Sequence, residues 1–167
     1  MMMRTIVVCA SLIAISFLCL ANCNEKDVSL SRAQIDALSK EILKNTPENV
    51  HFTKGTTFSW VLLRFSPEDR FPKIKREILS RMQGKYVVYE SEKEIPIDSQ
   101  RLGEDGKLLG YQDGFSFSIV LKPIDENRVE IRYRDWEGVL AASGRTIVYL
   151  WDGETWQVNK KRNGWIS

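Results

Sequence analysis

Two carboxylates lie close together in the C-terminal third of the chain, at Asp135 and Glu137 on either side of Trp136. Alternate residues of a β-strand point to the same face, so a strand here places both carboxylates side by side. Mutual repulsion can raise the pKa of one member of such a pair and fit it for acid or base chemistry. The simpler interpretation is an exposed pair balanced by Arg132 and Arg134, because such charge ladders commonly solvate a sheet. Asp135, Trp136 and Glu137 are all kept as candidates for a ligand site.

His51 is the only histidine of the chain, and its neighbours Asn49 and Lys54 indicate a loop. In a cleft this side chain could act as a general base, whereas on an exposed loop it has no chemical role. A single histidine excludes zinc motifs that need two, and the cysteine count excludes a cysteine-rich zinc site. The nucleophile motif Gly-x-Ser-x-Gly is absent as well. We keep His51 as a candidate ligand-site residue and predict no catalytic residue, no metal site and no cofactor, which favours a binding protein over an enzyme.

The first 22 residues have the layout of a secretory signal peptide. One basic residue, Arg4, precedes an apolar run from Thr5 to Ala21, and polar sequence begins at Asn22. This order of charged start, apolar middle and small residues before a cut is typical of a leader that is removed on export. We therefore predict a signal peptide at residues 1–22, a polar tether at residues 23–30 and a single domain at residues 31–167.

Cys23 is the only cysteine that would remain after the leader is removed, because Cys9 and Cys19 lie within it. A lone exported cysteine calls for pairing, a free thiol or modification. The run Leu20-Ala21-Asn22-Cys23 resembles the lipobox of bacterial lipoproteins, although Asn22 stands where that family usually has Gly, Ala or Ser. The resemblance implies a lipid on Cys23 and a location in the cell envelope.

Two other fates of the leader stay open. Ordinary cleavage after Ala21 would leave a soluble periplasmic or extracellular protein. An uncleaved leader would act as a membrane anchor, although its apolar run is at the lower end of the range that spans a bilayer.

The charges of the exported part nearly balance, because removal of the leader removes only Arg4 from 24 basic and 22 acidic residues. This balance predicts no nucleic-acid partner. Two groups of cations could still meet anionic lipid head groups. One lies between Arg70 and Arg81, among acidic residues, and the other is Lys160, Lys161 and Arg162. The simpler interpretation of both is a solvated surface.

Two helices must help to position these residues. Ser31 and Gln34 have the spacing of a capping box, and Pro47 requires the first helix to end at or before Asn45. The second helix begins at Pro72, which suits the first helical position, and ends near Gln83 before a glycine. Apolar residues recur on one side of each helix, so each helix is expected to cover another element.

Strands account for most of the remaining chain. Apolar and aromatic residues predict strands over residues 56–65 and 86–89. The charged, glycine-containing stretch from Ser91 to Asp113 is expected to be a long surface excursion. Alternation then predicts a meander over residues 115–122, 128–134 and 147–151, with a hairpin turn at Asp152-Gly153 and a further turn at Asn163-Gly164.

The expected fold class is therefore α+β, with two amphipathic helices packed on one face of a curved, mainly antiparallel sheet that ends in a β-meander. The five tryptophans lie mostly in or beside the predicted strands. They could line a concavity that binds an apolar ligand or a partner strand, but aromatic side chains more often fill the core of a small domain.

The order helix, strand, helix and meander, with Trp151-Asp152-Gly153-Glu154-Thr155-Trp156 in its last hairpin, resembles the nuclear transport factor 2-like superfamily. That family includes both enzymes and binding modules, so the resemblance implies a cone-shaped α+β fold and leaves activity open. We expect an exported, lipid-anchored, non-enzymatic envelope protein that binds the membrane through Cys23 and acts on an unknown protein or apolar small-molecule ligand. The alternative is a small-molecule enzyme or ligand-binding module of this fold.

Overall fold

A computed structural model describes residues 28–46, 58–138 and 141–165 of the chain, and Cys23 and His51 lie outside these residues. Within them the chain forms two α-helices, two short 3₁₀ helices and one eight-stranded sheet. In chain order the elements are α1 (Arg32–Leu43), β1 (Trp60–Ser66), α2 (Pro72–Gln83), β2 (Val87–Tyr89), η1 (Glu92–Glu94), η2 (Ile97–Ser99), β3 (Gln100–Leu102), β4 (Leu108–Tyr111), β5 (Gly114–Asp125), β6 (Arg128–Gly138), β7 (Ala141–Trp151) and β8 (Trp156–Trp165).

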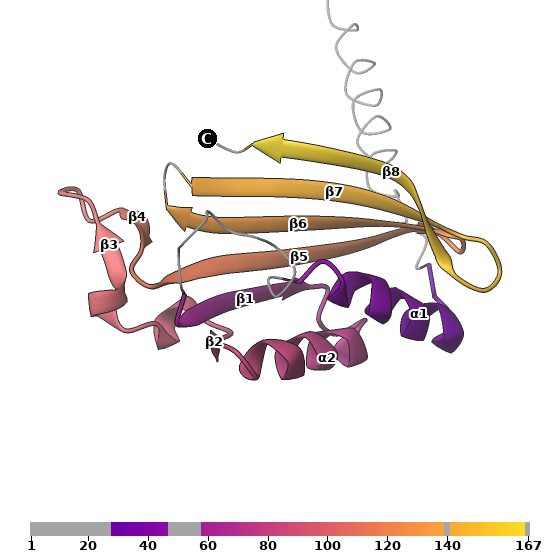
Figure 1. Ribbon diagram of the computed structural model, residues 1–167, viewed down its shortest axis with the longest axis horizontal. Coiled ribbons are helices and arrows are strands. Elements are labelled where there is room, and N and C mark those ends of the chain that lie inside the picture. Colours follow the sequence, from indigo (N-terminus) through magenta and orange to yellow (C-terminus); the bar gives the residue numbers. More distant parts are fainter. Residues whose placement is uncertain (1–27, 47–57, 139–140, 166–167) are drawn as a thin grey trace, which may run out of the picture.

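The sheet is mixed but mainly antiparallel. Strand β1 runs parallel to both of its neighbours, β2 and β5, whereas β5, β6, β7 and β8 form a continuous antiparallel meander (Figure 1). Parallel pairing of β1 with β5 requires a long crossover, which contains α2 and the β2–β4 segment. The predicted α+β class with a C-terminal meander is therefore confirmed.

Both helices begin and end where local sequence signals place them. The Ser31 hydroxyl accepts a hydrogen bond from the Gln34 amide, and the Gln34 side chain accepts one from the Ser31 amide, so the predicted capping box is present. Helix α2 starts at Pro72 and ends before Gly84, as predicted. Helix α1 ends at Leu43, within the limit that Pro47 sets.

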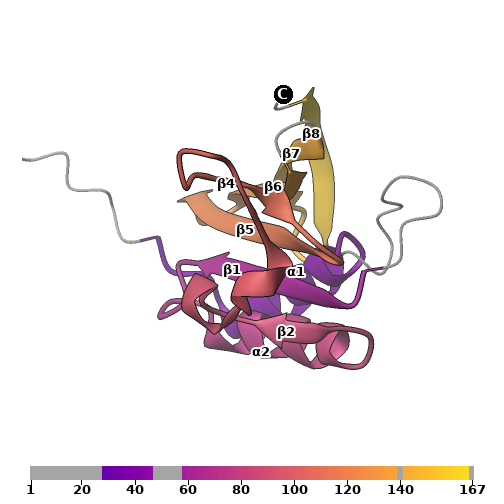
Figure 2. The ribbon, with the colours of Figure 1, turned by 90° about the vertical axis from the view of Figure 1, so that its left-hand side faces the viewer.

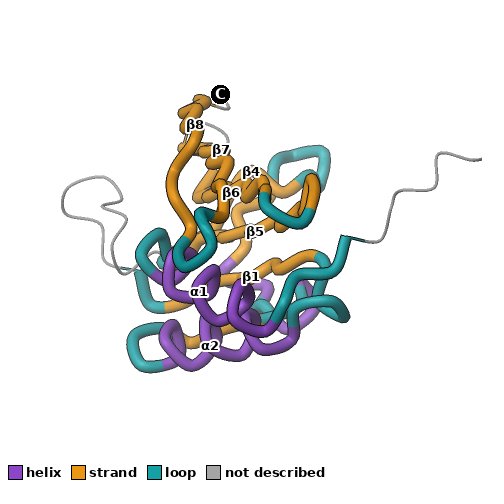
Figure 3. The backbone as a smooth tube through the Cα atoms, turned by 90° about the vertical axis from the view of Figure 1, so that its right-hand side faces the viewer, coloured by secondary structure: helices purple, strands orange, loops and turns teal. Residues whose placement is uncertain are grey.

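The main core lies between the helices and one face of the sheet. Figures 2 and 3 show the helices packed beside β1, while β8 runs from its start next to α1 toward the far edge of the sheet. Alternate residues of β5 and β6 enter this core, including Phe117, Ile119 and Ile131, none of which is more than 1 % exposed. The helices contribute Leu38 and Ile78, which are fully buried. This alternation buries one face of each strand, and most of the opposite face of the β5–β8 meander is exposed to solvent.

A second, smaller core lies on the opposite face of the sheet. Trp60 and Leu62 of β1 pack there with Ile95 and Tyr111, and the last two belong to the stretch that was expected to be a surface excursion. That expectation is wrong for part of the stretch, because Ile95 is 4 % and Tyr111 only 2 % exposed. The β3–β4 arm folds back over the sheet, since β4 pairs with β6 at Gly110 and Gly138.

The C-terminal hairpin is partly as predicted. Gly153 has a φ of 106°, and the Asp152 carboxylate accepts hydrogen bonds from the Glu154 and Thr155 amides at 2.9 and 2.7 Å, so a turn forms at Asp152-Gly153. No turn forms at Asn163-Gly164, because β8 continues to Trp165 in register with β7. Pairing along the whole length of β7 outweighs the local turn preference of these two residues.

Candidate functional site

Asp135 lies on the helix-facing side of β6. Its register partners are Phe117 of β5 and Ser143 of β7, and the Ser143 hydroxyl donates to the two carboxylate oxygens at 2.7 and 2.8 Å. Burial raises the pKa of the Asp135 carboxyl group above its ordinary value, while the Ser143 hydrogen bond and the charge of Arg145 act in the opposite direction. Desolvation, rather than repulsion by Glu137, is therefore the main cause of this raised pKa.

The residues after Asp135 have different surroundings. Trp136 points to the opposite face of the sheet, where its ring meets Tyr111 edge-on at 5.1 Å in the second core. Glu137 sits where the register between β6 and β7 shifts, between Trp136 and Gly138. The strict alternation on which a side-by-side carboxylate pair depends is interrupted at this point. The side chains of Asp135 and Trp136 thus lie on opposite faces of the sheet, and they do not form one site.

A buried polar cluster surrounds Asp135, and it consists of Tyr133, Asp135, Ser143, Arg145 and Tyr149. The Arg145 guanidinium lies over the Tyr133 ring at 5.0 Å, and Arg145 pairs with Tyr133 in the register of β6 and β7. The buried Tyr133 hydroxyl lies beside that of Tyr149 without a well-formed hydrogen bond, and among the described residues the buried Arg145 Nε has no hydrogen-bond partner. Such unpaired buried polar atoms are uncommon, and they mark a place where a ligand could supply the missing partner.

The two phenols of this cluster are kept neutral. Burial raises the pKa of Tyr149 and raises that of Tyr133 well above its ordinary value. The Tyr149 hydroxyl also accepts a long hydrogen bond of 3.4 Å from the Asn45 side chain, just after α1. Tyr133, Arg145 and Tyr149 could not be recognised as site residues from the sequence alone. The inward alternation of Tyr133 and Tyr149 was visible in the sequence, whereas Arg145 lies before the predicted strand at residues 147–151. The burial of the cluster depends on strand pairing and on a helix that are distant in the chain.

We predict that the stability of the Asp135→Asn variant, compared with that of the wild type at the same pH, increases as the pH rises. The pKa of Asp135 in the folded protein is raised above its ordinary 3.8, so the wild type loses stability as the pH increases from the unfolded to the folded pKa. Asparagine does not titrate, so the variant avoids this loss, and its side-chain oxygen can still accept a hydrogen bond from Ser143. The measurement is the urea midpoint of both proteins at acidic and neutral pH. Asp125→Asn is the control with the opposite sign, because Arg128 lowers the pKa of Asp125. A stability difference between wild type and Asp135→Asn that does not change with pH contradicts the prediction.

The open face of the meander carries a group of cations, which we call the basic face: Arg132, Arg134, Lys160 and Arg162. Arg132 and Arg162 flank Thr146 in the register of β6, β7 and β8, so their backbones are about 10 Å apart, two strand spacings. All four side chains are exposed. They line a hollow of about 490 Å³ together with Glu130, Thr146 and Val148.

A β-bulge in β8 places the side chains of Lys160 and Arg162 on the basic face. The register of β7 and β8 shifts between Val148 and Tyr149, so Asn159 has no partner, and Lys160 faces Val148. Strict alternation from Trp156 would have turned Lys160 and Arg162 toward the helices. Because of the bulge, Trp156 enters the main core while Lys160 and Arg162 join the cations of β6 on the open face.

Most of the charge on the basic face is not neutralised by the described part of the chain. The Glu130 carboxylate accepts from Arg132 at 2.7 Å, whereas Arg134, Lys160 and Arg162 form no ion pair with a described residue. Cross-strand neighbours of like charge destabilise a sheet. Guanidinium and ammonium groups such as those that line this hollow can bind phosphate, sulfate or carboxylate groups.

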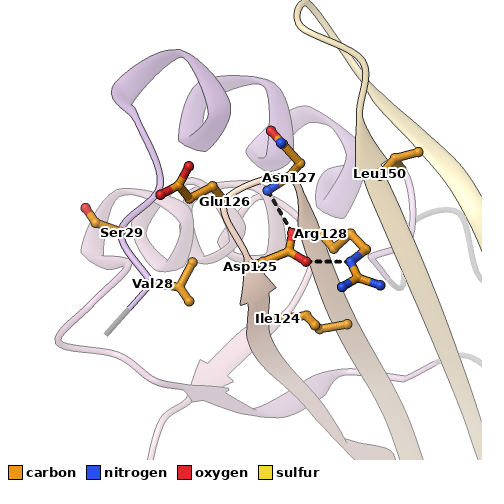
Figure 4. A pocket seen from close by; sticks show the side chains of 8 residues that line it. All are labelled: Val28, Ser29, Ile124, Asp125, Glu126, Asn127, Arg128 and Leu150. Carbon is orange, nitrogen blue, oxygen red and sulfur yellow. Dashed lines mark hydrogen bonds and ion pairs between the residues drawn. The ribbon is translucent and has the colours of Figure 1, made fainter. Parts of the chain in front are cut away.

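A second hollow of about 700 Å³ lies at the β5–β6 turn. Figure 4 shows Val28 and Ser29 on one side of it and the turn with Leu150 on the other. An ion pair of 2.6 Å between Asp125 and Arg128 closes the turn. Apolar side chains that line the hollow, Ile124 and Leu150, are each 42 % exposed.

Comparison with models of known families, with curated proteins and with solved structures found no match for this chain. Within residues 28–46, 58–138 and 141–165, no helix has the length and apolar character needed to cross a membrane. The same residues contain no group of three or more His, Cys, Asp or Glu side chains that could hold a metal ion.

Proposed function

We propose that this chain is an exported protein, anchored in the cell envelope by a lipid on Cys23, that acts by binding an anionic partner and not by catalysis. The export and the anchor are supported by the leader and by the single cysteine that remains after it. The binding role is supported by the basic face. Exported location, anchor and partner are all parts of one proposal.

The observation that carries the binding role is the unneutralised charge of Arg134, Lys160 and Arg162 around one hollow. Some exposed cations elsewhere, such as Lys73 and Arg128, lie within 2.6 Å of a carboxylate oxygen, whereas these three cations share one hollow and form no ion pair with a described residue. Repulsion between neighbouring cations destabilises the folded protein, and a bound anionic ligand would relieve this repulsion. A site of this kind needs no apolar pocket, because guanidinium groups recognise anions by paired hydrogen bonds.

The test uses two variants of equal charge change. The basic-face variant carries Arg134→Gln, Lys160→Gln and Arg162→Gln. The control variant carries Arg32→Gln, Lys40→Gln and Arg76→Gln, which are exposed positions on the two helices. Each removes three positive charges, so only the location of the charge differs between them.

We predict that inorganic polyphosphate binds the wild-type protein and the control variant with similar affinity. The basic-face variant is expected to bind about tenfold more weakly, because exposed charge pairs contribute about 0.5 kcal/mol each. Titration followed by calorimetry gives the affinities, and added salt should weaken binding in all three proteins. Equal affinity of the two variants would show that the basic face is not the anion site.

A second candidate function is favoured by the buried polar cluster. The desolvated carboxyl of Asp135 and the buried hydroxyl of Tyr133 are groups that a small-molecule enzyme or ligand-binding module could use, as the resemblance to the nuclear transport factor 2-like superfamily implies. This candidate depends on the desolvation of Asp135. It loses its basis if the pH-dependent stability of Asp135→Asn matches that of the wild type.

A further inference from the structure

We propose that the basic face lies against an anionic membrane surface and that the short tether after Cys23 holds it there. The inference rests on the proposed function, from which it takes the lipid anchor and the anion-binding basic face. It adds the identity of the anion, which is the layer of lipid head groups, and the orientation of the domain on the bilayer.

The first support is the position at which the described chain begins. The Val28 carbonyl accepts a hydrogen bond of 2.6 Å from Arg70, and Leu30 is buried in the main core at 7 % exposure. The chain is therefore attached to the folded body from Val28 onward, inside the range predicted as a tether. Val28 lies at the hollow of the β5–β6 turn, opposite Leu150 (Figure 4).

This attachment point is at one end of the open face. Leu150 is the register partner of Arg128, and both belong to the same side of the sheet as Glu130, Arg132 and Val148, two and four residues along the strands. The cations of the basic face nearest to this hollow are Lys160, beside Val148, and Arg132, which lie about 7 and 13 Å along the sheet from Leu150 and Arg128. A force that pulls Val28 toward the bilayer pulls this end of the open face with it.

The second support is the length of the tether. Five residue steps separate Cys23 from Val28, and an extended chain spans at most about 3.6 Å per residue, so the tether reaches at most about 18 Å. Screening by salt weakens charge attraction over about 8 Å at physiological ionic strength. A lipid on Cys23 would thus keep the domain within about two screening lengths of the head groups, close enough for the cations to select the orientation.

The third support is the apolar character of the same face. Val120, Ile124 and Leu150 are 38 %, 42 % and 42 % exposed, and Val120 is the register partner of Arg132. Aliphatic side chains beside cations suit the boundary between head groups and acyl chains. A soluble polyanion such as a nucleic acid or an acidic polysaccharide would leave these aliphatic side chains in water, so a membrane is the better match.

The test uses the full exported chain with Cys23→Ser, so that no lipid can be attached and any membrane binding comes from the domain. This protein is mixed with phosphatidylcholine vesicles that either contain or lack phosphatidylglycerol, and bound protein is measured by flotation. We expect binding to the phosphatidylglycerol vesicles, loss of binding with added salt, and little binding to phosphatidylcholine alone. Combining Cys23→Ser with the basic-face variant should weaken binding about a hundredfold, at roughly fivefold for each cation near the surface.

The control variant, also combined with Cys23→Ser, should bind as the parent does, and circular dichroism of all three proteins checks that they are folded. Equal vesicle binding by the two variants overturns the proposal. Absence of vesicle binding while polyphosphate still binds through the basic face also overturns it, and leaves the proposed function standing. Loss of both kinds of binding in the folded parent defeats the proposed function as well.

Discussion

Replacing Cys23 by alanine is expected to abolish the incorporation of a palmitate analogue and to release the protein from salt-washed membranes. The lipid of a bacterial lipoprotein is attached through the cysteine sulfur, so no other residue of the exported part can replace it. Metabolic labelling of cells that express wild type or Cys23→Ala, followed by fractionation, measures both effects. Salt washing matters because it removes protein held only by the charges of the basic face.

Each other fate of the leader predicts a different result. Cleavage after Ala21 gives unlabelled, soluble protein from both the wild type and the variant. An uncleaved leader keeps both proteins in the salt-washed membranes without label, and the first methionine remains attached. Equal labelling of the two proteins, or no label in either, refutes the anchor.

Replacing Trp156 by alanine is expected to destabilise the domain by about 3–5 kcal/mol, the usual cost of deleting a large buried aromatic side chain. Trp156 is 4 % exposed in the main core, and its indole N–H donates at 2.8 Å to the carbonyl of Gln34 in the first turn of α1. The side chain therefore joins the last hairpin to the first helix. Urea unfolding followed by circular dichroism measures the change.

Trp151 provides the matched control for this substitution. Its ring packs against that of Trp156 at 5.2 Å, but Trp151 is only partly buried, and it belongs to the edge of the core. Trp151→Ala removes the same ring contact and is expected to cost less, since less apolar surface is exposed by its loss. The interpretation of Trp156 as the link between hairpin and helix is wrong if Trp151→Ala is the more destabilising change.

Local signals were sufficient to predict the helices. The capping box at Ser31 and the pair of Pro72 and Gly84 act within one or two helical turns, and all of them operate in the structure as expected. The strands of the meander were predicted in part. The two-residue apolar repeat located β5, most of β6 and the second half of β7, but β7 begins at Ala141 and not at residue 147. Ile131 and Tyr133, in the predicted strand at residues 128–134, lie on the buried side of β6.

Register could not be predicted in the same way. A bulge adds one residue to a strand and reverses the faces of every residue after it, and nothing in the local sequence marks its position. The shift after Val158 turns Lys160 and Arg162 outward, and the shift at Glu137 interrupts the predicted carboxylate pair. The extension of β8 through Asn163-Gly164 has the same origin, since it depends on pairing with β7.

The sequence by itself determined the α+β class, the ends of both helices, the alternation of the meander and the expectation of an exported, lipid-bearing chain. Only the tertiary structure decided that β1 runs parallel to its neighbours, that part of the charged excursion forms a second core, that Asp135 is desolvated, and that cations from two strands share one hollow. The physical reason is the distance along the chain over which each kind of interaction acts. Caps, turns and alternation act between residues that are near each other in the chain, whereas burial and charge density depend on which distant strands become neighbours.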